Sequence, residues 1–272
     1  MRAAVLLYHS NNVSRNDYAG NDHIALMQDL RLLAELHIPV VSLHRLVDAF
    51  DGKVEVPPIC VALSFDDGSW FDWHDLAHPT LGPQRSFANI MFDARTARPD
   101  VPLHATSFVI VSPAAREELD RTSLVGQGWW GEDWWQAALD SGLMAIESHS
   151  FDHHHDLIAA TATGLPGGDF QAVDHYAAAD AEIRQASDYL DARLPNRRTR
   201  LFAFPYGHAN DYLIHDYLPN RRAEHRLAAA FTTEPKPVSR GENRWALGRY
   251  VCGEHWRSED ELRALLRDAL HG

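Results

Sequence analysis

Apolar residues recur along the chain in short runs of strand length, and segments of helical periodicity separate several of these runs. The apolar runs lie at Ala3–Tyr8, Pro39–Ser42, Ile59–Phe65, Ala105–Val111, Leu143–Ser148, Arg200–Pro205, Leu227–Thr233 and Ala246–Val251. Helical spacing predicts helices over Asp22–His37, over Tyr176–Leu194 and after a capping pattern at Ser258. Strands and helices that alternate along the whole chain predict a parallel sheet, and seven or eight such units favour a barrel. Because no linker or repeat divides this pattern, we expect one domain over residues 1–272.

Two long polar segments, Ser69–His104 and Ala159–His175, interrupt the alternation. Both follow predicted strands at the end of the sheet where such folds carry their chemistry. Connections of this length in a compact domain are usually functional loops or inserts, so we expect both at the rim of a site.

Composition narrows the class of partner. The chain has 272 residues, and its net charge of -13 argues against nucleic acid or an acidic membrane surface as the ligand.

Cys60 and Cys252 lie in apolar, strand-like segments, which favours buried free thiols over a disulfide or a metal pair. No stretch approaches the ~18 apolar residues of a membrane span. The apolar run after Met1 is too short for a signal peptide, so we expect a cytoplasmic protein, or an exported one if the start has been trimmed.

Two polar motifs follow predicted strands. Asp66-Asp67-Gly68 ends the apolar run Ile59–Phe65, and adjacent carboxylates need a cation or a proton-transfer task to offset their repulsion. Asp-Asp-Gly alone also fits a surface turn. The histidine-rich stretch from His149 to His155 follows the strand Leu143–Ser148. Two imidazoles and one carboxylate form a metal site with open positions, so the two motifs together predict a divalent-metal centre.

A third motif, Phe204-Pro205-Tyr206-Gly207, halts the strand that begins at Arg200. A tight turn of this kind exposes a backbone N–H that could face an oxyanion. Without its context, a plain strand-ending turn is the better interpretation of this motif.

These motifs, in this order, resemble the polysaccharide deacetylase family, also called the NodB-homology domain or carbohydrate esterase family 4. The resemblance rests on Ser64–Gly68, Ser148-His149-Ser150 with a second histidine, and Phe204–Gly207, and similar segments extend from Leu7-Tyr8-His9 to Leu247–Val251. It implies a distorted (β/α)7-type barrel and a metal-dependent hydrolase that removes N-acyl groups from amino sugars.

The resemblance also implies roles for individual residues. Asp66 corresponds to the general base, Asp67 to the carboxylate ligand and His149 to the first histidine ligand of the metal. Three intervening residues, the common family spacing, would make His153 the second histidine ligand. The spacing back from Asp156-Leu157 favours His154 instead, as in poly-N-acetylglucosamine deacetylases, and we predict His154. The metal implied is zinc, with cobalt or nickel as alternatives, and the Tyr206 N–H would hold the oxyanion.

The sequence departs from the family pattern in two places. Ala203 stands where many members have an arginine that orients the base, and we predict that Arg249 supplies that charge to Asp66. The late Leu-x-His motif, whose histidine is the general acid, has no clean copy. His255 is the candidate, although a surface loop histidine is an equally good interpretation.

Candidate substrate contacts are His9, Trp70, Trp130 and Pro205, since sugar rings stack on aromatic faces. We therefore predict a deacetylase acting on N-acetylated amino sugars in a glycan. The alternatives are hydrolysis of a small N-acyl or cyclic-amide metabolite and a carbohydrate-binding barrel without catalysis. Neither the sugar nor the oligomeric state follows from the sequence.

Overall fold

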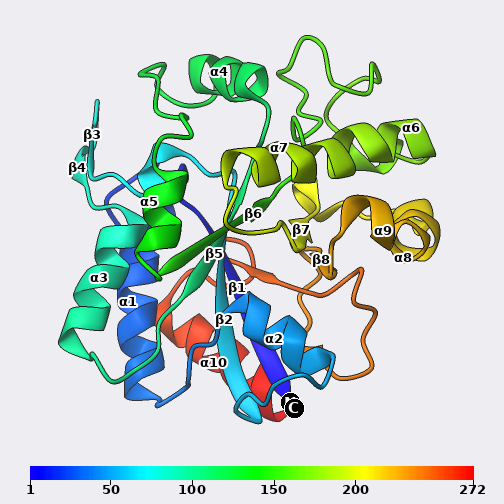
Figure 1. Ribbon diagram of the computed structural model, residues 1–272. Coiled ribbons are helices and arrows are strands. Elements are labelled where there is room, and N and C mark those ends of the chain that lie inside the picture. Colours follow the sequence, from blue (N-terminus) through cyan, green and yellow to red (C-terminus); the bar gives the residue numbers. More distant parts are fainter.

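The computed structural model describes residues 1–272, and at its centre parallel strands curl into a half-barrel (Figure 1). The order across this sheet is β10-β1-β2-β5-β6-β7-β8, and all neighbours in it run parallel. The strands are β1 (Arg2–His9), β2 (Ile59–Asp66), β5 (Ala105–Val109), β6 (Met144–Ser148), β7 (Leu201–Ala203), β8 (Ala229–Phe231) and β10 (Tyr250–Val251). The edge strands β8 and β10 do not pair with each other, so the curl stays open. This architecture confirms the predicted distorted α/β barrel.

Helices cover the outside of the curl (Figure 1). They are α1 (Asp22–Glu35), α2 (Leu43–Phe50), α3 (Phe87–Ala97), α4 (Pro113–Thr122), α5 (Trp135–Asp140), α6 (Tyr176–Ala179), α7 (Gln185–Arg193), α8 (Leu218–Asn220), α9 (Arg222–His225) and α10 (Glu259–His271). A π-helical turn over Asp180–Arg184 joins α6 to α7. Ser258 caps α10 as predicted, because its hydroxyl accepts the Glu261 N–H at 3.3 Å. None of the helices combines the length and the apolar character needed to cross a membrane.

The strands are buried on both faces, as expected for a parallel sheet between two layers. Alternate residues of β1 belong to two different clusters: Leu6 and Tyr8 pack toward α1, α3 and α10, whereas Ala3 and Val5 pack inside the curl. Residues of β1 and β8 meet in the inner cluster, although these strands are far apart in the sheet order. Both cysteines are buried free thiols, as predicted.

Two segments differ from the sequence-based expectation. Pro39–Ser42 forms only an isolated bridge between Val40 and Val61, because Ser42 already caps α2 by accepting the Arg45 N–H at 3.2 Å. The polar segment Ser69–His104 contains α3 and a hairpin of β3 (Leu76–His78) and β4 (Gly82–Gln84). A short strand β9 (Val238–Ser239) adds an antiparallel partner to β1. By contrast, Ala159–His175 is a loop with a single helical turn at Phe170–Ala172.

Candidate active site

The carboxyl ends of the parallel strands bring together polar residues from distant parts of the chain. His9 is the last residue of β1 and lies in register with Asp66, the last residue of β2. His149 follows β6 directly, and Tyr206 lies in the turn that follows β7. Parallel strands end at one edge, so this edge collects the side chains that can carry chemistry.

Asp66 is buried and forms a bidentate ion pair with Arg249. The two guanidinium N–H groups donate to Oδ1 at 2.7 Å and to Oδ2 at 2.8 Å, and the Arg249 Nε donates to the Thr232 carbonyl at 3.0 Å. Burial alone would raise the pKa of Asp66, but the charges of Arg249 and His149 outweigh burial and hold that pKa below its usual value. The structure thus places Arg249 in contact with Asp66, and this contact favours the ionised form of the carboxyl group.

Asp67 follows in a left-handed backbone conformation with φ of 73°, which is rare for a residue other than glycine. Gly68 has φ of 74°, and a Cβ there would lie 2.4 Å from a Val109 methyl group, so the turn requires glycine. The Asp67 carbonyl accepts the Trp130 indole N–H at 3.1 Å, and the Asn11 amide donates to the Asp67 carboxylate at 3.3 Å. Within this turn the Asp67 carboxylate faces the histidines, and the His149 Nε2 also lies 3.6 Å from the Asp66 Oδ2.

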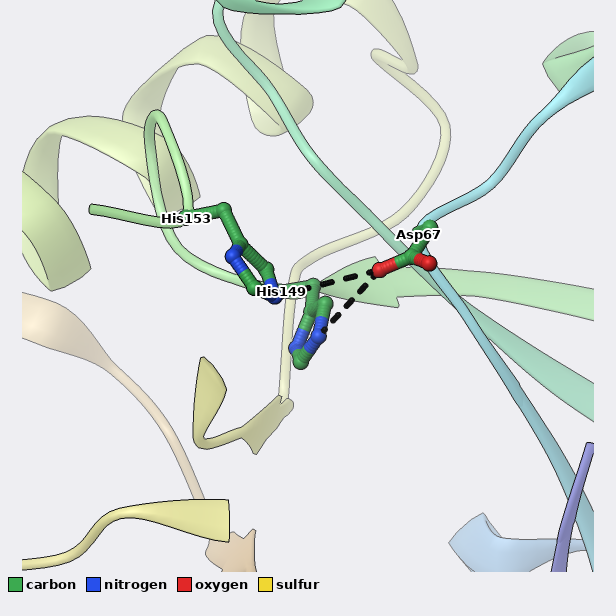
Figure 2. Close-up of side chains that lie close together, drawn as sticks. All are labelled: Asp67, His149 and His153. Atoms are coloured by element: carbon green, nitrogen blue, oxygen red, sulfur yellow. Dashed lines mark ion pairs between the residues drawn. The ribbon is translucent and has the colours of Figure 1, made fainter. Parts of the chain in front are cut away.

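Two histidines face Asp67 from the segment after β6 (Figure 2). The Asp67 Oδ1 lies 3.7 Å from the His149 Nε2 and 3.9 Å from the His153 Nε2. The His149 Nδ1 donates to the Ala203 carbonyl at 2.9 Å, which leaves its Nε2 lone pair directed at the cluster. Burial, and then the charges of neighbouring histidines, lower the pKa of His153 well below its usual value, which favours the neutral ring that a metal ligand requires.

The structure corrects the prediction that His154 joins this cluster. The His154 Nε2 is hydrogen-bonded to the Thr163 hydroxyl at 3.0 Å, and its ring packs edge-on against Phe170. The reason lies in the backbone, since Ser150, His153 and His154 have φ of 68°, 64° and 49°. The chain therefore turns sharply between neighbouring histidines, and His153 takes the inward position.

The cluster fits a divalent cation. One carboxylate oxygen and two imidazole nitrogens, all within 4.8 Å of one another, can converge on one ion. Ligand atoms of a tetrahedral zinc site lie roughly 3.4 Å apart, close to the separations across Asp67. Three protein ligands leave a position open, as in catalytic zinc sites.

A cavity of about 250 Å³ opens above the cluster. His9, Asp66, Asp67, His149, His153 and Tyr206 line it on one side, and Ile110, Leu119 and Trp130 form an apolar wall. Tyr206 has φ of 57°, and the adjacent Gly207 has no room for a Cβ because Thr233 Oγ1 would lie 2.0 Å away. The turn after β7 therefore fits closely against the end of β8.

Besides Arg249 and His154, three predicted site residues do not line this cavity, namely Trp70, Pro205 and His255. The Trp70 indole N–H donates to Asp133 at 2.9 Å, and its ring packs on the core. Pro205 is buried beneath the turn that presents Tyr206. His255 lies beyond β10, where its Nδ1 accepts the Val251 N–H at 2.8 Å. His255 is thus not among the residues that line the cavity with Asp66, and the structure gives its predicted role as the acid no support.

His9 is a further histidine of the cavity and lies beside Asp66. It lines the cavity in register with Asp66, and its Nδ1 is buried without a hydrogen-bond partner. Its main-chain N–H donates to Asp22 at 2.8 Å, which fixes the strand end. Sequence reasoning considered His9 only as a substrate contact, and it overlooked Asn11. Their position at the end of a strand adjacent to β2 is the signal that could have identified both.

The curled parallel half-barrel and the titratable residues at the carboxyl ends of its strands place the chain in the α/β-barrel class. Solved structures share this fold at low sequence identity. IcaB from Ammonifex degensii matches with a TM-score of 0.66 and 19% identity, over 98% of this chain and 97% of that one. A de-N-acetylase from Aggregatibacter actinomycetemcomitans matches with a TM-score of 0.65 and 18% identity, over 97% and 100%. The Streptococcus pyogenes deacetylase PplD, solved with acetate, matches with a TM-score of 0.61 and 19% identity, over 98% of both chains.

The polysaccharide deacetylase family model matches residues 53–218, more than half of the chain. The chain therefore belongs to the polysaccharide deacetylase family. No curated protein sequence matches it.

Proposed function

We propose that the protein is a metal-dependent N-deacetylase that removes acetyl groups from amino sugars of a glycan. The observation that carries this proposal is the ion pair of Asp66 with Arg249, directly beside the cluster of Asp67, His149 and His153 in one cavity. The ion pair keeps Asp66 ionised, as a proton acceptor must be. The cluster supplies the ligands that a divalent cation needs.

Asp67, His149 and His153 would hold the cation, for which we propose zinc, with cobalt or nickel as functional substitutes. When bound, such a cation lowers the pKa of a coordinated water and polarises an acyl carbonyl. The His149 hydrogen bond to the Ala203 carbonyl would keep that ring in the tautomer that ligates through Nε2.

Asp66, Tyr206 and His9 would carry out the proton transfers and stabilise charge. Asp66 accepts the proton of the attacking water, since each of its oxygens retains a free lone pair beside the Arg249 N–H. The Tyr206 main-chain N–H donates to the developing oxyanion, a contact whose loss typically costs about 3 kcal/mol of barrier. His9 then gives a proton to the departing amine as the C–N bond breaks. Acetate and the free amino sugar are the products.

The size of the cavity supports a substrate that inserts a single sugar unit. Its volume of about 250 Å³ is of the order of one N-acetylated hexose, so neighbouring units of a polymer would lie outside it. The same size supports a second candidate, a small N-acyl metabolite, and activity against chain length separates the two.

The test is acetate release from N-acetylglucosamine oligomers of graded length. Apo protein is reloaded with zinc, cobalt or nickel, and Asp66→Asn serves as the inactive control. We expect release that requires metal, vanishes in Asp66→Asn and rises with oligomer length. Bound metal without release from any oligomer would contradict the glycan substrate and favour a small amide. Glycan binding that is indifferent to a chelator would instead favour a binding-only role.

A further inference from the structure

Three histidines stand next to one another in the segment after β6, so a shift of one residue in this loop would change which imidazole faces Asp67. The loop spans Ser150–His155, and its left-handed residues Ser150, His153 and His154 lie in a conformation that L side chains rarely adopt. Such a backbone persists only where its surroundings hold it. The structure therefore raises the question of which contacts fix the register of the loop.

Glu182 touches the loop through both its main chain and its side chain. It is fully buried in the π-helical turn between α6 and α7, and its carbonyl accepts the Phe151 N–H at 2.9 Å. Its carboxyl group lies 3.3 Å from the Asp152 N–H, which donates to Oε2. Single π-turns inside helices recur at functional sites, because they redirect one residue of the helix.

Asp152 transmits this contact to the histidines. Its Oδ1 accepts the His154 N–H at 2.8 Å, and its Oδ2 accepts the Ala162 N–H at 2.5 Å. Asp152 therefore ties the backbone of His154 to the loop that follows. In this arrangement the His154 ring contacts Thr163 and the His153 ring faces Asp67.

Neither Glu182 nor Asp152 forms an ion pair with a lysine, arginine or histidine, although both are buried. Burial, and then the charge of Asp152, raise the pKa of Glu182 well above its usual value. Because burial favours the neutral form of Glu182, its carboxyl group can lie against Asp152 without repulsion between two negative charges.

We propose that Glu182 is a positioning residue that fixes the register of the Ser150–His155 loop, so that His153 rather than His154 faces Asp67 and His149. This inference rests on the proposed function only in taking that cluster as a metal site. It assigns to a helix residue outside the cavity the choice between two adjacent histidines.

The test measures cobalt affinity by competition with a chromophoric chelator, in the full chain. In the native background, His153→Ala should abolish tight binding, and His154→Ala should leave the affinity unchanged. Glu182→Ala should weaken binding by about 10–100-fold, the usual effect of losing a group that orients a ligand. In the Glu182→Ala background, His154→Ala should become harmful and His153→Ala less so.

Glu182→Gln is the matched variant, because its amide can still accept the Asp152 N–H and stay neutral, and it should retain native affinity. The visible spectrum of bound cobalt provides a readout that general destabilisation does not change, and we expect its bands to shift in Glu182→Ala but not in Glu182→Gln. If Glu182→Ala does not fold, Asp152→Ala is measured instead; it removes the acceptor of the His154 and Ala162 N–H groups and should show the same weakening. Native affinity and an unchanged spectrum in Glu182→Ala, or in Asp152→Ala, would overturn the inference. Absence of cobalt binding in the native chain would refute the proposed metal site instead.

Discussion

At the scale of single residues, the buried ion pair of Asp66 with Arg249 is the main electrostatic feature of the site. The arginine that many family members carry near the third motif is replaced here by Ala203, and a residue beside a different strand takes its place. The Arg249 guanidinium is fully buried and lies over the Phe108 ring at 5.5 Å. Water therefore cannot take the place of Asp66 as its partner. Each member of the pair therefore depends on the other for stability.

This dependence predicts a large loss of stability when one partner is removed. Arg249→Met leaves the buried Asp66 carboxylate uncompensated, and we expect the free energy of unfolding to fall by about 3–5 kcal/mol. Urea unfolding monitored by circular dichroism measures this change. The double variant Arg249→Met with Asp66→Asn removes the isolated charge and should recover much of the loss. An equal loss in the single and double variants would show that packing, not charge, dominates at this position.

The sequence predicts those site residues that lie at the ends of strands. Asp66, Asp67 and His149 end or follow strands that the apolar pattern identifies, and the structure brings all three together. The choice of His153 over His154 depends on left-handed turns that local sequence does not encode. His9 and His255 illustrate the same limit, because only the order of strands places His9 beside Asp66.

At the scale of elements, long amphipathic helices were predicted well and short ones poorly. The segments over α1 and α10 carry repeated leucines on one face, whereas the large apolar residues of α3, Phe87, Ile90, Met91 and Phe92, lie within a stretch that is otherwise mostly polar. Ser86 caps α3 by accepting the Asn89 N–H at 3.1 Å, but a lone serine is common in loops as well. Tertiary packing against α1 selects the helix here.

The helices beside β8 contain a buried histidine whose titration should control local stability. In α9, the His225 Nε2 donates to the Leu218 carbonyl and its Nδ1 accepts the Leu227 N–H, each at 3.0 Å. A second proton would face that N–H donor. Burial, only partly offset by the Leu218 carbonyl, lowers the pKa of His225 from 6.5 to about 4.

The sign of the pH effect follows from these values. The unfolded chain takes up a proton on His225 near pH 6.5, whereas the folded chain takes it up only near pH 4. The neutral His225 therefore contributes fully to the free energy of unfolding above pH 6.5, and this contribution is lost as the pH falls toward 4. We expect His225→Gln to remove about 3 kcal/mol of this pH dependence. The measurement is the unfolding free energy of both proteins between these values. His215→Gln, at an exposed position, is the control, and equal slopes for native protein and His225→Gln would contradict the prediction.

At the scale of the whole molecule, the two ends of the chain complete the sheet together. β1 lies between β10 and β2, and the Arg2 side chain donates to the Ala269 carbonyl at 2.5 Å. The termini accordingly lie close together at the foot of the barrel (Figure 1). The family model covers residues 53–218, which leaves out His9, Arg249 and both strands that carry or adjoin them. The site thus depends on segments outside the matched region.

We therefore expect that the chain cannot fold without its last segment. Truncation after Ser239 removes β10, α10 and Arg249, which exposes one edge of β1 and leaves Asp66 as an isolated buried charge. Near-ultraviolet circular dichroism should show no fixed aromatic packing in the truncated chain, and thermal unfolding should lose its cooperative transition. Adding the missing peptide, residues 240–272, in trans tests whether the edge of β1 is the cause, because recovery of the transition requires pairing with β1. Arg249→Met in the full-length chain is the matched control and should unfold cooperatively at a lower temperature. A cooperative transition in the truncated chain would mean that the central strands are stable without their C-terminal neighbour.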